Sequence, residues 1–174
     1  MYNLINNEIS NARAGKEAYI LLKLNSLVDN DIIEKLYQAN DAGVKIKMIV
    51  RGICSLIPGE KNLSEHVEAI SIVDKYLEHS RVLVFCNNGN ELYYITSADW
   101  MTRNLDRRIE IACPIYDRDV QQEIRKMLEL QLNDNVKARI INAIQDNVYV
   151  SDYNRPALRS QIEIYNYYKQ QIYG

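Results

Sequence analysis

The chain has 174 residues, and its 21 Lys and Arg against 23 Asp and Glu give a formal net charge of −2. This length suits one domain with its own core, and an apolar content of 47% excludes a disordered chain. The longest apolar runs, at residues 19–22 and 82–85, are far shorter than the ~20 residues of a membrane span. The balanced charge argues against a nucleic-acid-binding domain, because such domains usually carry a basic excess.

The three cysteines, Cys54, Cys86 and Cys113, are widely spaced and form no CxxC pair. Zinc sites and disulfide frameworks need clustered or paired spacing, so we expect three buried, reduced thiols. The chain does not open with a basic segment followed by an apolar stretch, which argues against secretion. We therefore expect a cytoplasmic protein, with peripheral attachment to a membrane as the alternative.

The first 50 residues alternate between helical and strand patterns. Apolar spacing predicts a helix over residues 3–14 and a buried strand over residues 18–24. Asp29 is a suitable N-cap for a second helix that ends before Gly43, and residues 44–50 alternate as a second strand. This α-β-α-β order is typical of a mostly parallel sheet with covering helices.

The rest of the chain is predicted to be less regular at first. Residues 52–62 form a long loop after the second strand, and residues 69–73 form a short strand followed by one helical turn at 74–77. The segment Asn87-Asn88-Gly89-Asn90 predicts a hairpin turn. Further strands are predicted at 81–86, 92–96 and 107–112, and helices at 117–132 and 156–172.

The two histidines have different surroundings. His66 lies in a polar loop and is expected to be solvated, whereas His79 precedes Arg81 by two residues at the start of a predicted strand. Residues two apart on a strand share a face, so we expect these two side chains to lie together. A lone histidine is usually structural, and the nearby arginine is what favours a chemical role here.

Further charged residues follow the predicted strands. Arg51 stands at the carboxyl end of the second strand, where open α/β sheets bind ligands. Asp99 follows the strand at 92–96, and Arg108 comes soon afterwards. Guanidinium groups match phosphate oxygens in pairs, and an imidazole can act as a nucleophile or as a proton donor. This set favours phosphoryl transfer, and a solvated face with acidic partners is the alternative.

Several blocks of sequence resemble known phosphotransfer proteins. The pattern His-x-Arg, hairpin, Ser-x-Asp resembles the half-site of the phospholipase D superfamily, which has Lys and Asn where this chain has Arg81 and Asp99. A much closer resemblance, over essentially the whole chain, is to the C-terminal domain of bacterial polyphosphate kinase. It is carried by KLNSLVD (23–29), IVRGICSLIPG (49–59), YLEHSR (76–81), SADWMTRNL (97–105), VKAR (136–139) and RSQ (159–161).

This resemblance implies an α/β fold, namely a phospholipase-D-like mixed β-sheet flanked by helices in a single domain over residues 1–174. Family enzymes reversibly transfer the terminal phosphate of ATP to polyphosphate through a phosphohistidine, with Mg²⁺. The resemblance therefore implies a fragment that lacks the N-terminal domain, the head domain and the first catalytic C-terminal domain. The nucleophilic histidine and the residues associated with Mg²⁺ lie in that first domain, so no metal ligand is expected here, and little or no activity is expected from the fragment alone.

The same resemblance assigns roles to individual residues. Arg51 corresponds to an arginine that contacts ATP, and His79 to a second essential histidine, the catalytic residue of this half. Arg81 and Arg108 are expected to bind ATP or phosphate, whereas the negative charge of Asp99 suits it to orient a neighbouring side chain. The implied partners are ATP or ADP, polyphosphate, the preceding domains and further copies of the enzyme, without nucleic acid or a membrane span.

Two other functions stay open. A phospholipase-D-like phosphodiesterase active as a dimer would pair two copies of His79, although Arg81 and Asp99 depart from that superfamily's pattern. A non-catalytic module that binds polyphosphate would do so without any dependence on His79.

Overall fold

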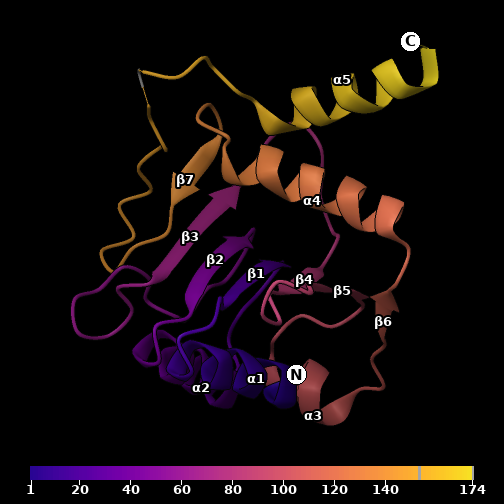
Figure 1. Cartoon of the computed structure of the whole chain (residues 1–174). Helices are drawn as coiled ribbons and strands as arrows, with labels where there is room; N and C mark the ends of the chain where they lie inside the picture. The colour runs from indigo at the N-terminus through magenta and orange to yellow at the C-terminus, as the bar shows by residue number, and fades with distance from the viewer. Residues whose placement is uncertain (153, 174) are drawn as a thin grey trace.

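The computed structural model describes residues 1–152 and 154–173, and its centre is a mixed sheet in the order β6-β5-β4-β1-β2-β3-β7 (Figure 1). The strands are β1 (Tyr19–Leu24), β2 (Lys45–Val50), β3 (Val67–Ile72), β4 (Val82–Phe85), β5 (Leu92–Thr96), β6 (Ala112–Ile115) and β7 (Ala138–Ile140). The helices are α1 (Tyr2–Arg13), α2 (Asn30–Asp41), α3 (Thr102–Arg107), α4 (Arg118–Leu132) and α5 (Ser160–Tyr173).

Strand direction determines which loops meet. Strands β1, β2 and β3 are parallel to one another, whereas β4 is antiparallel to β1 and β5 is antiparallel to β4. Strands β6 and β7 are antiparallel to β5 and β3. The ends of β1, β2, β3 and β5 therefore lie at the same edge of the sheet as the starts of β4, β6 and β7. We call this edge the carboxyl edge.

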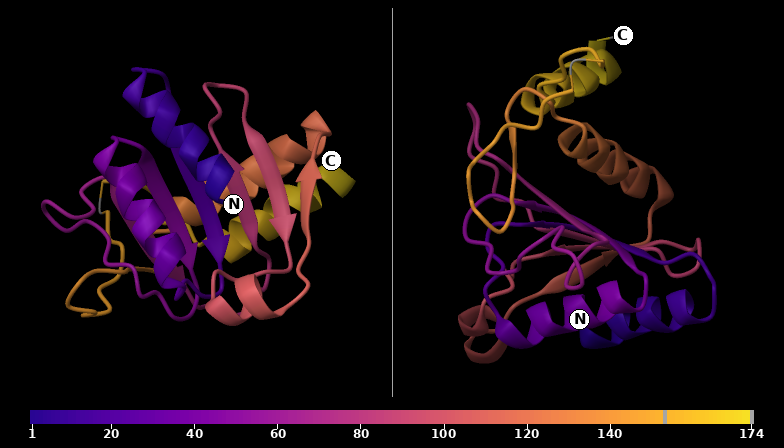
Figure 2. Two further views of the ribbon diagram at one scale, coloured as in Figure 1. Left: turned by 90° about the horizontal axis from the view of Figure 1, so that it is seen from below. Right: turned by 90° about the vertical axis from the view of Figure 1, so that its left-hand side faces the viewer.

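The helices cover both faces of the sheet. Figure 2 shows α1 and α2 against one face, α4 against the other, and α5 on the outer side of α4. Alternation along β1 follows this division, because Ile20 and Leu22 belong to the core beneath α1 and α2, while Leu21 packs in the core beneath α4. Lys23 shares the face of Leu21 and is buried there, with only 7% of its surface exposed.

Most of the predicted helices and strands are confirmed, and so are the expected cap at Asp29 and the expected hairpin turn. Asp29 caps α2 by accepting a hydrogen bond from the amide of Ile32 at 3.2 Å. The hairpin between β4 and β5 turns through Asn87 and Asn88, whose φ values are 47° and 54°. Asparagine tolerates this left-handed region better than most residues do.

Several predictions are wrong. Residues 107–112 are not a strand, because α3 extends to Arg107 and β6 begins at Ala112. No helical turn forms at 74–77, since the backbone N–H and C=O of Tyr76 are both bonded to the side chain of Gln161.

Other predictions need smaller corrections. The parallel order expected from the first 50 residues holds for β1, β2 and β3 within the mixed sheet, α5 begins at Ser160 rather than at residue 156, and strand β7 has no predicted counterpart. The three cysteines are free, as expected, but only Cys86 is buried, while Cys54 is half-buried and Cys113 is exposed.

Asp134 connects the end of α4 with the start of α5. Its side chain is fully buried, and Oδ1 accepts hydrogen bonds from the amides of residues 136–138 at 2.9, 2.7 and 3.2 Å. Oδ2 accepts from the amide and the hydroxyl of Ser160 at 2.8 and 2.7 Å. A single carboxylate therefore holds the turn into β7 and the first turn of α5.

Asp134→Ala is expected to lower the free energy of unfolding by about 3 kcal/mol, because it leaves several buried donors without an acceptor. Asp119→Ala is the control, since Asp119 is exposed in the first turn of α4, and its loss is expected to cost less than about 1 kcal/mol. Urea unfolding followed by circular dichroism measures both. Equal effects of the two substitutions would contradict this role for Asp134.

Candidate functional site

Three loops are joined at the carboxyl edge. The amide of Leu27, in the loop after β1, donates to the carbonyl of Ile53 at 2.8 Å, and the amide of Ser55 donates to the carbonyl of Leu27 at 2.8 Å. On its other side the same loop meets Trp100, whose amide donates to the carbonyl of Ser26 at 3.1 Å. The indole of Trp100 is fully buried. The loops after β1, β2 and β5 therefore form one rigid base.

Gly52 allows the loop after β2 to approach the loop after β1. Its amide donates to the carbonyl of Asn25 at 2.8 Å. A Cβ added at residue 52 would lie only 2.8 Å from that carbonyl oxygen, which is too close for any side chain. Glycine at this position therefore brings the backbone of Arg51 next to Asn25.

The predicted site residues are connected by one series of hydrogen bonds. Arg51 Nε donates to Asn25 Oδ1 at 3.0 Å, and the backbone N–H of Asn25 donates to Asp99 Oδ1 at 2.7 Å. Asp99 Oδ2 accepts from Arg81 Nη2 at 3.0 Å, and the same Nη2 lies 3.2 Å from His79 Nε2. We call these five residues the site network.

Asp99 is the centre of the site network. Its side chain is buried, and its Oδ1 also accepts from the amide of Ser26 at 3.1 Å. Burial by itself would raise the pKa of Asp99, but the hydrogen bond from Arg81, the two backbone amides and the charge of Arg81 outweigh burial and lower it. Both carboxylate oxygens are therefore occupied by protein donors, which suits Asp99 to hold Arg81 rather than to bind a ligand.

Arg51 differs from the other cations of this region in its partner. Arg81 is paired with Asp99, and Lys23 is paired with Glu78, whereas Arg51 bonds a neutral amide through Nε alone. Within the described residues, the Nη atoms of Arg51 make no hydrogen bond. A half-buried guanidinium with free donors and no carboxylate partner is well suited to bind an anion.

The contact between His79 and Arg81 determines the tautomer of the imidazole. A guanidinium can only donate hydrogen bonds, so His79 Nε2 must be the acceptor at 3.2 Å. The proton of the neutral ring then lies on Nδ1. His79 is exposed, and its Nδ1–H is available to a bound oxygen. The two side chains meet as expected, although both residues precede β4 rather than lying in it.

Arg108 lies near the site network but outside it. It follows α3 directly and is exposed. Hydrogen bonds from Ser97 and Asn104 lower the pKa of Glu110, and the nearby charges of Arg108 and Arg81 lower it further. Arg108 therefore acts through its charge on Glu110, as Arg81 also does, but among the described residues it makes no hydrogen bond to the site network.

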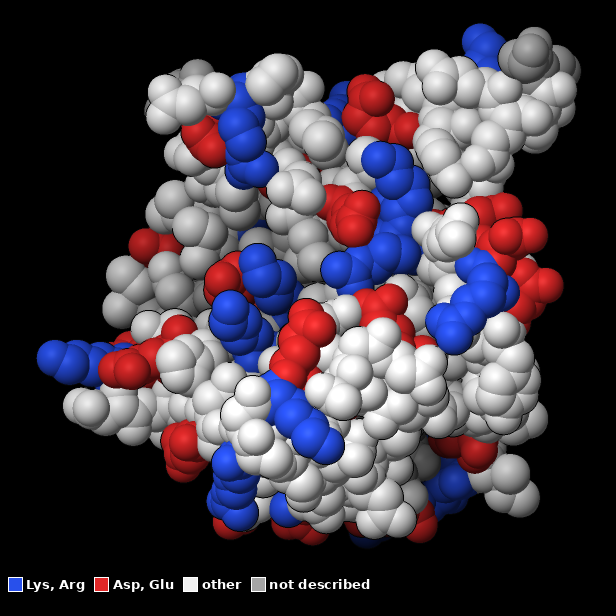
Figure 3. Space-filling model, in the orientation of Figure 1, with Lys and Arg blue, Asp and Glu red and all other residues white. Residues whose placement is uncertain are grey.

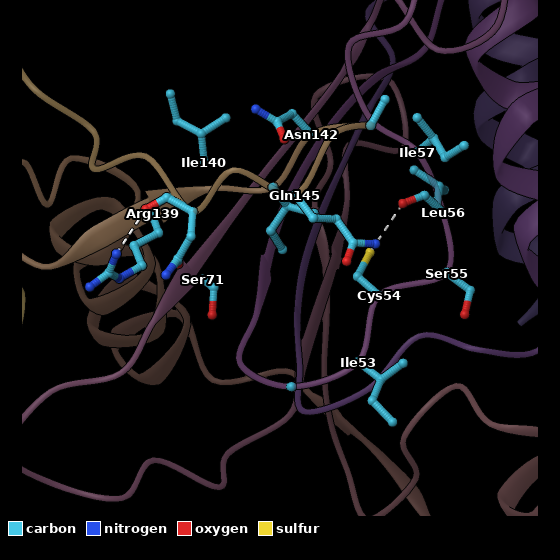
Figure 4. Close-up of a pocket in the computed structure, with 14 residues that line it drawn as sticks. Ile53, Cys54, Ser55, Leu56, Ile57, Ser71, Arg139, Ile140, Asn142 and Gln145 are labelled. Carbon is cyan, nitrogen blue, oxygen red and sulfur yellow. Dashed lines mark hydrogen bonds between the residues drawn. The ribbon is translucent and has the colours of Figure 1, made fainter.

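A cavity of about 680 Å³ opens beside the loop that follows Arg51. Figure 4 shows Arg139 on one side of it and residues Ile53 to Ile57 on the other. Arg139 is its only charged lining residue, and this side chain is bonded to the carbonyl of Asn147 at 2.8 Å. No member of the site network lines this cavity, so the site network and this cavity are separate features.

The described residues contain no group of three or more His, Cys, Asp or Glu that could hold a metal ion. No helix in the described ranges is long and apolar enough to cross a bilayer. On the face drawn in Figure 3, acidic and basic side chains are interspersed, in keeping with a chain whose formal net charge is −2.

The sequence reasoning missed three residues of this region. Asn25 links Arg51 to Asp99, while Lys23 and Glu78 form an ion pair behind His79. A signal existed for each of them. Lys23 interrupts an otherwise apolar strand, Asn25 follows that strand directly, and Glu78 is adjacent to His79.

Comparisons with known proteins point to one family. The family described as polyphosphate kinase C-terminal domain 2 matches residues 1–161. The polyphosphate kinase of Vibrio vulnificus (strain YJ016) is 53% identical over 169 residues, which are 97% of this chain but only 24% of that protein. This chain thus spans about a quarter of the length of the relatives that it matches.

Solved structures support the same fold. The crystal structure of polyphosphate kinase from Porphyromonas gingivalis superposes with a TM-score of 0.94 at 47% identity, covering 97% of this chain and 26% of that one. A phospholipase D family member from Salmonella typhimurium superposes with a TM-score of 0.55 at 14% identity, covering 78% of this chain and 89% of that one. The expected phospholipase-D-like mixed sheet flanked by helices is therefore confirmed.

Asp99→Asn is expected to destabilise the chain by about 1–3 kcal/mol at pH 7, because the amide removes the charge that Arg81 faces. The pKa of Asp99 is lowered in the folded state. Its contribution to stability is therefore complete above the pKa of about 3.9 that the group has in the unfolded chain, and it is lost as the pH falls through the folded-state pKa. Urea titrations at several pH values should show the difference between the two proteins shrinking in acid. A difference that is independent of pH would contradict the argument.

We expect neutral His79 to carry its proton on Nδ1. Nitrogen-15 NMR of the ring at about pH 8.5, where imidazoles are uncharged, distinguishes the two tautomers by the separate shifts of Nδ1 and Nε2. Arg81→Met should reduce the preference, because the donor to Nε2 is lost. A native ring protonated on Nε2 would contradict the contact with Arg81.

Proposed function

Because the chain belongs to the polyphosphate kinase family, as a C-terminal domain 2, we propose that it supplies one half of a site that reversibly transfers the terminal phosphate of ATP to polyphosphate. The observation that carries this proposal is the site network, which places an unpaired guanidinium and an imidazole donor on one hydrogen-bonded frame. Anionic substrates suit this arrangement, since Arg51 has no carboxylate partner of its own.

The proposed mechanism divides the work among the members of the network. Arg51 binds phosphate oxygens through its free Nη donors and stabilises the charge that develops on them. His79 donates a hydrogen bond from its Nδ1–H to the oxygen that departs from the transferred phosphorus, and this stabilises the charge that develops there while the ring stays neutral. Arg81, held by Asp99, keeps the imidazole in that tautomer and adds positive charge. Arg108 contributes to the potential along the path of the phosphates.

The other half of the reaction is assigned to a different part of the enzyme. Phosphoryl transfer proceeds in line, with attack on one side of the phosphorus and departure on the other. We propose that preceding domains of the same enzyme supply the attacking histidine and any Mg²⁺. In this proposal residues 1–174 are one domain of a cytoplasmic, homo-oligomeric enzyme, and the chain alone has little or no activity.

The test uses a chimera in which this chain replaces the matching 169-residue segment of the Vibrio vulnificus polyphosphate kinase. His79→Ala and Arg51→Ala are expected to lower the rate of ATP-dependent polyphosphate synthesis by about 100-fold or more, as for the loss of a donor in a catalytic site. The rate of phosphate incorporation is the measurement.

Two matched substitutions serve as controls for this test. His66→Ala removes the other histidine, which is exposed before β3, and Arg13→Ala removes an exposed arginine at the end of α1. Both should leave the activity of the chimera unchanged. Full activity of the His79→Ala chimera would contradict the mechanism, and polyphosphate binding by the 174-residue chain that is insensitive to His79→Ala would then favour a binding module.

A further inference from the structure

A second polar cluster lies behind His79, on the face of the sheet that α4 covers. It consists of Lys23, Glu78, Gln131 and Gln161, and we call it the Glu78 cluster. Lys23 comes from β1, Gln131 from α4 and Gln161 from α5, while Glu78 directly precedes His79. Lys23, Gln131 and Gln161 are each less than 8% exposed. The reaction proposed above uses none of them.

Three donors converge on the Glu78 carboxylate. Its Oε2 accepts from Lys23 and from the Gln131 side chain, and its Oε1 accepts from Gln161 Nε2 at 2.9 Å. Lys23 also donates to Gln131 Oε1 at 3.1 Å. Burial lowers the pKa of Lys23, and the attraction of Glu78 acts in the opposite direction. A partly buried ion pair that further hydrogen bonds support holds its members in one geometry.

The first turn of α5 holds the segment that leads to Glu78. Gln161 bonds both backbone groups of Tyr76, since the amide of Tyr76 donates to Oε1 and Nε2 donates to the carbonyl, each at 2.9 Å. Arg159 bonds Asp74 through two nitrogens at 2.8 and 2.6 Å. Figure 1 shows this segment running from β3 past the start of α5 before it enters β4.

The same segment has no backbone ladder of its own. In the part of the chain that the structure describes, residues 73–80 make no backbone–backbone hydrogen bond. Among the described residues, His79 itself is hydrogen-bonded only to Arg81, at its ring nitrogen and its carbonyl. The position of the imidazole therefore depends on Arg81 on one side and on Glu78 on the other.

We propose that Glu78 is a positioning residue for His79, and that α5 belongs to the phosphotransfer site through Gln161 although it touches no phosphate. The effect on activity rests on the proposed role of His79, whereas the effect on the imidazole rests on these contacts alone. Releasing Gln161 frees Tyr76 and one oxygen of Glu78, so the ring loses its fixed distance to Arg81. A displacement of about 1 Å in a catalytic group can cost about 100-fold in rate.

The first experiment observes the imidazole directly in the 174-residue chain. Gln161→Met keeps the length of the side chain and adds no charge, but it removes all three hydrogen bonds of Gln161. We expect the Nδ1 and Nε2 shifts of His79 to move toward each other, because the contact with Arg81 is weakened. His66, exposed before β3, is the internal reference and should not change.

Gln170→Met is the matched control, since Gln170 is an exposed glutamine of the same helix and should leave both histidines as they are. If Gln161→Met unfolds the chain, Gln131→Met takes its place, because it removes one donor to Glu78 and leaves α5 bound to Tyr76. Unchanged His79 shifts in a folded Gln161→Met or Gln131→Met variant would overturn the proposal.

The second experiment measures activity in the chimera described above. Gln161→Met is expected to lower kcat by about 10- to 100-fold with little change in KM for ATP, because binding by Arg51 is untouched. An unchanged kcat would overturn the assignment of α5 to the site. Should His79→Ala also leave the chimera fully active, the proposed function would be the part that fails, and the NMR result would still decide whether Glu78 positions the ring.

Discussion

The ion pair between Arg81 and Asp99 is the interaction on which the arrangement of the site depends. Asp99 accepts two backbone amides of the loop after β1, so the carboxylate is fixed to the rigid base of the carboxyl edge. Arg81 then transmits this position to the imidazole of His79. A free aspartate in the site network would repel the phosphates of the proposed function. Because both of its oxygens are occupied, its charge is balanced locally and the remaining positive charge is that of Arg51.

The charges of the site are separated into paired and unpaired groups. Lys23 and Arg81 each have a carboxylate partner and act as framework, whereas Arg51 bonds an amide and keeps free donors. A paired cation holds its geometry, and an unpaired one supplies the field that an incoming phosphate experiences. In the proposed function, this division lets a chain with a net charge of −2 bind phosphate through one local guanidinium.

The polar contacts behind His79 extend the site to the far end of the chain. Asp134 fixes the first turn of α5 to the end of α4. Gln161 in this turn then holds Tyr76 and Glu78 by hydrogen bonds. Loops usually carry the reactive groups while regular elements hold them in place. Here a helix that lies outside α4 contacts a loop at the edge of the sheet, because the segment before β4 passes beside its start.

Local sequence was enough to determine most helices and strands, their caps and the hairpin turn, because periodicity, Asp at N-caps and Asn-Gly turns act over a few residues. The sequence blocks around Arg51, His79 and Asp99 also indicated the family. Only the tertiary structure decided the pairings: Asp99 with Arg81, Arg51 with Asn25, and Gln161 with Tyr76 across 85 positions of the chain. These depend on β4 lying antiparallel beside β1 and on α5 packing over α4. No local pattern specifies either of these, since strand order and helix docking are set by the packing of the whole core.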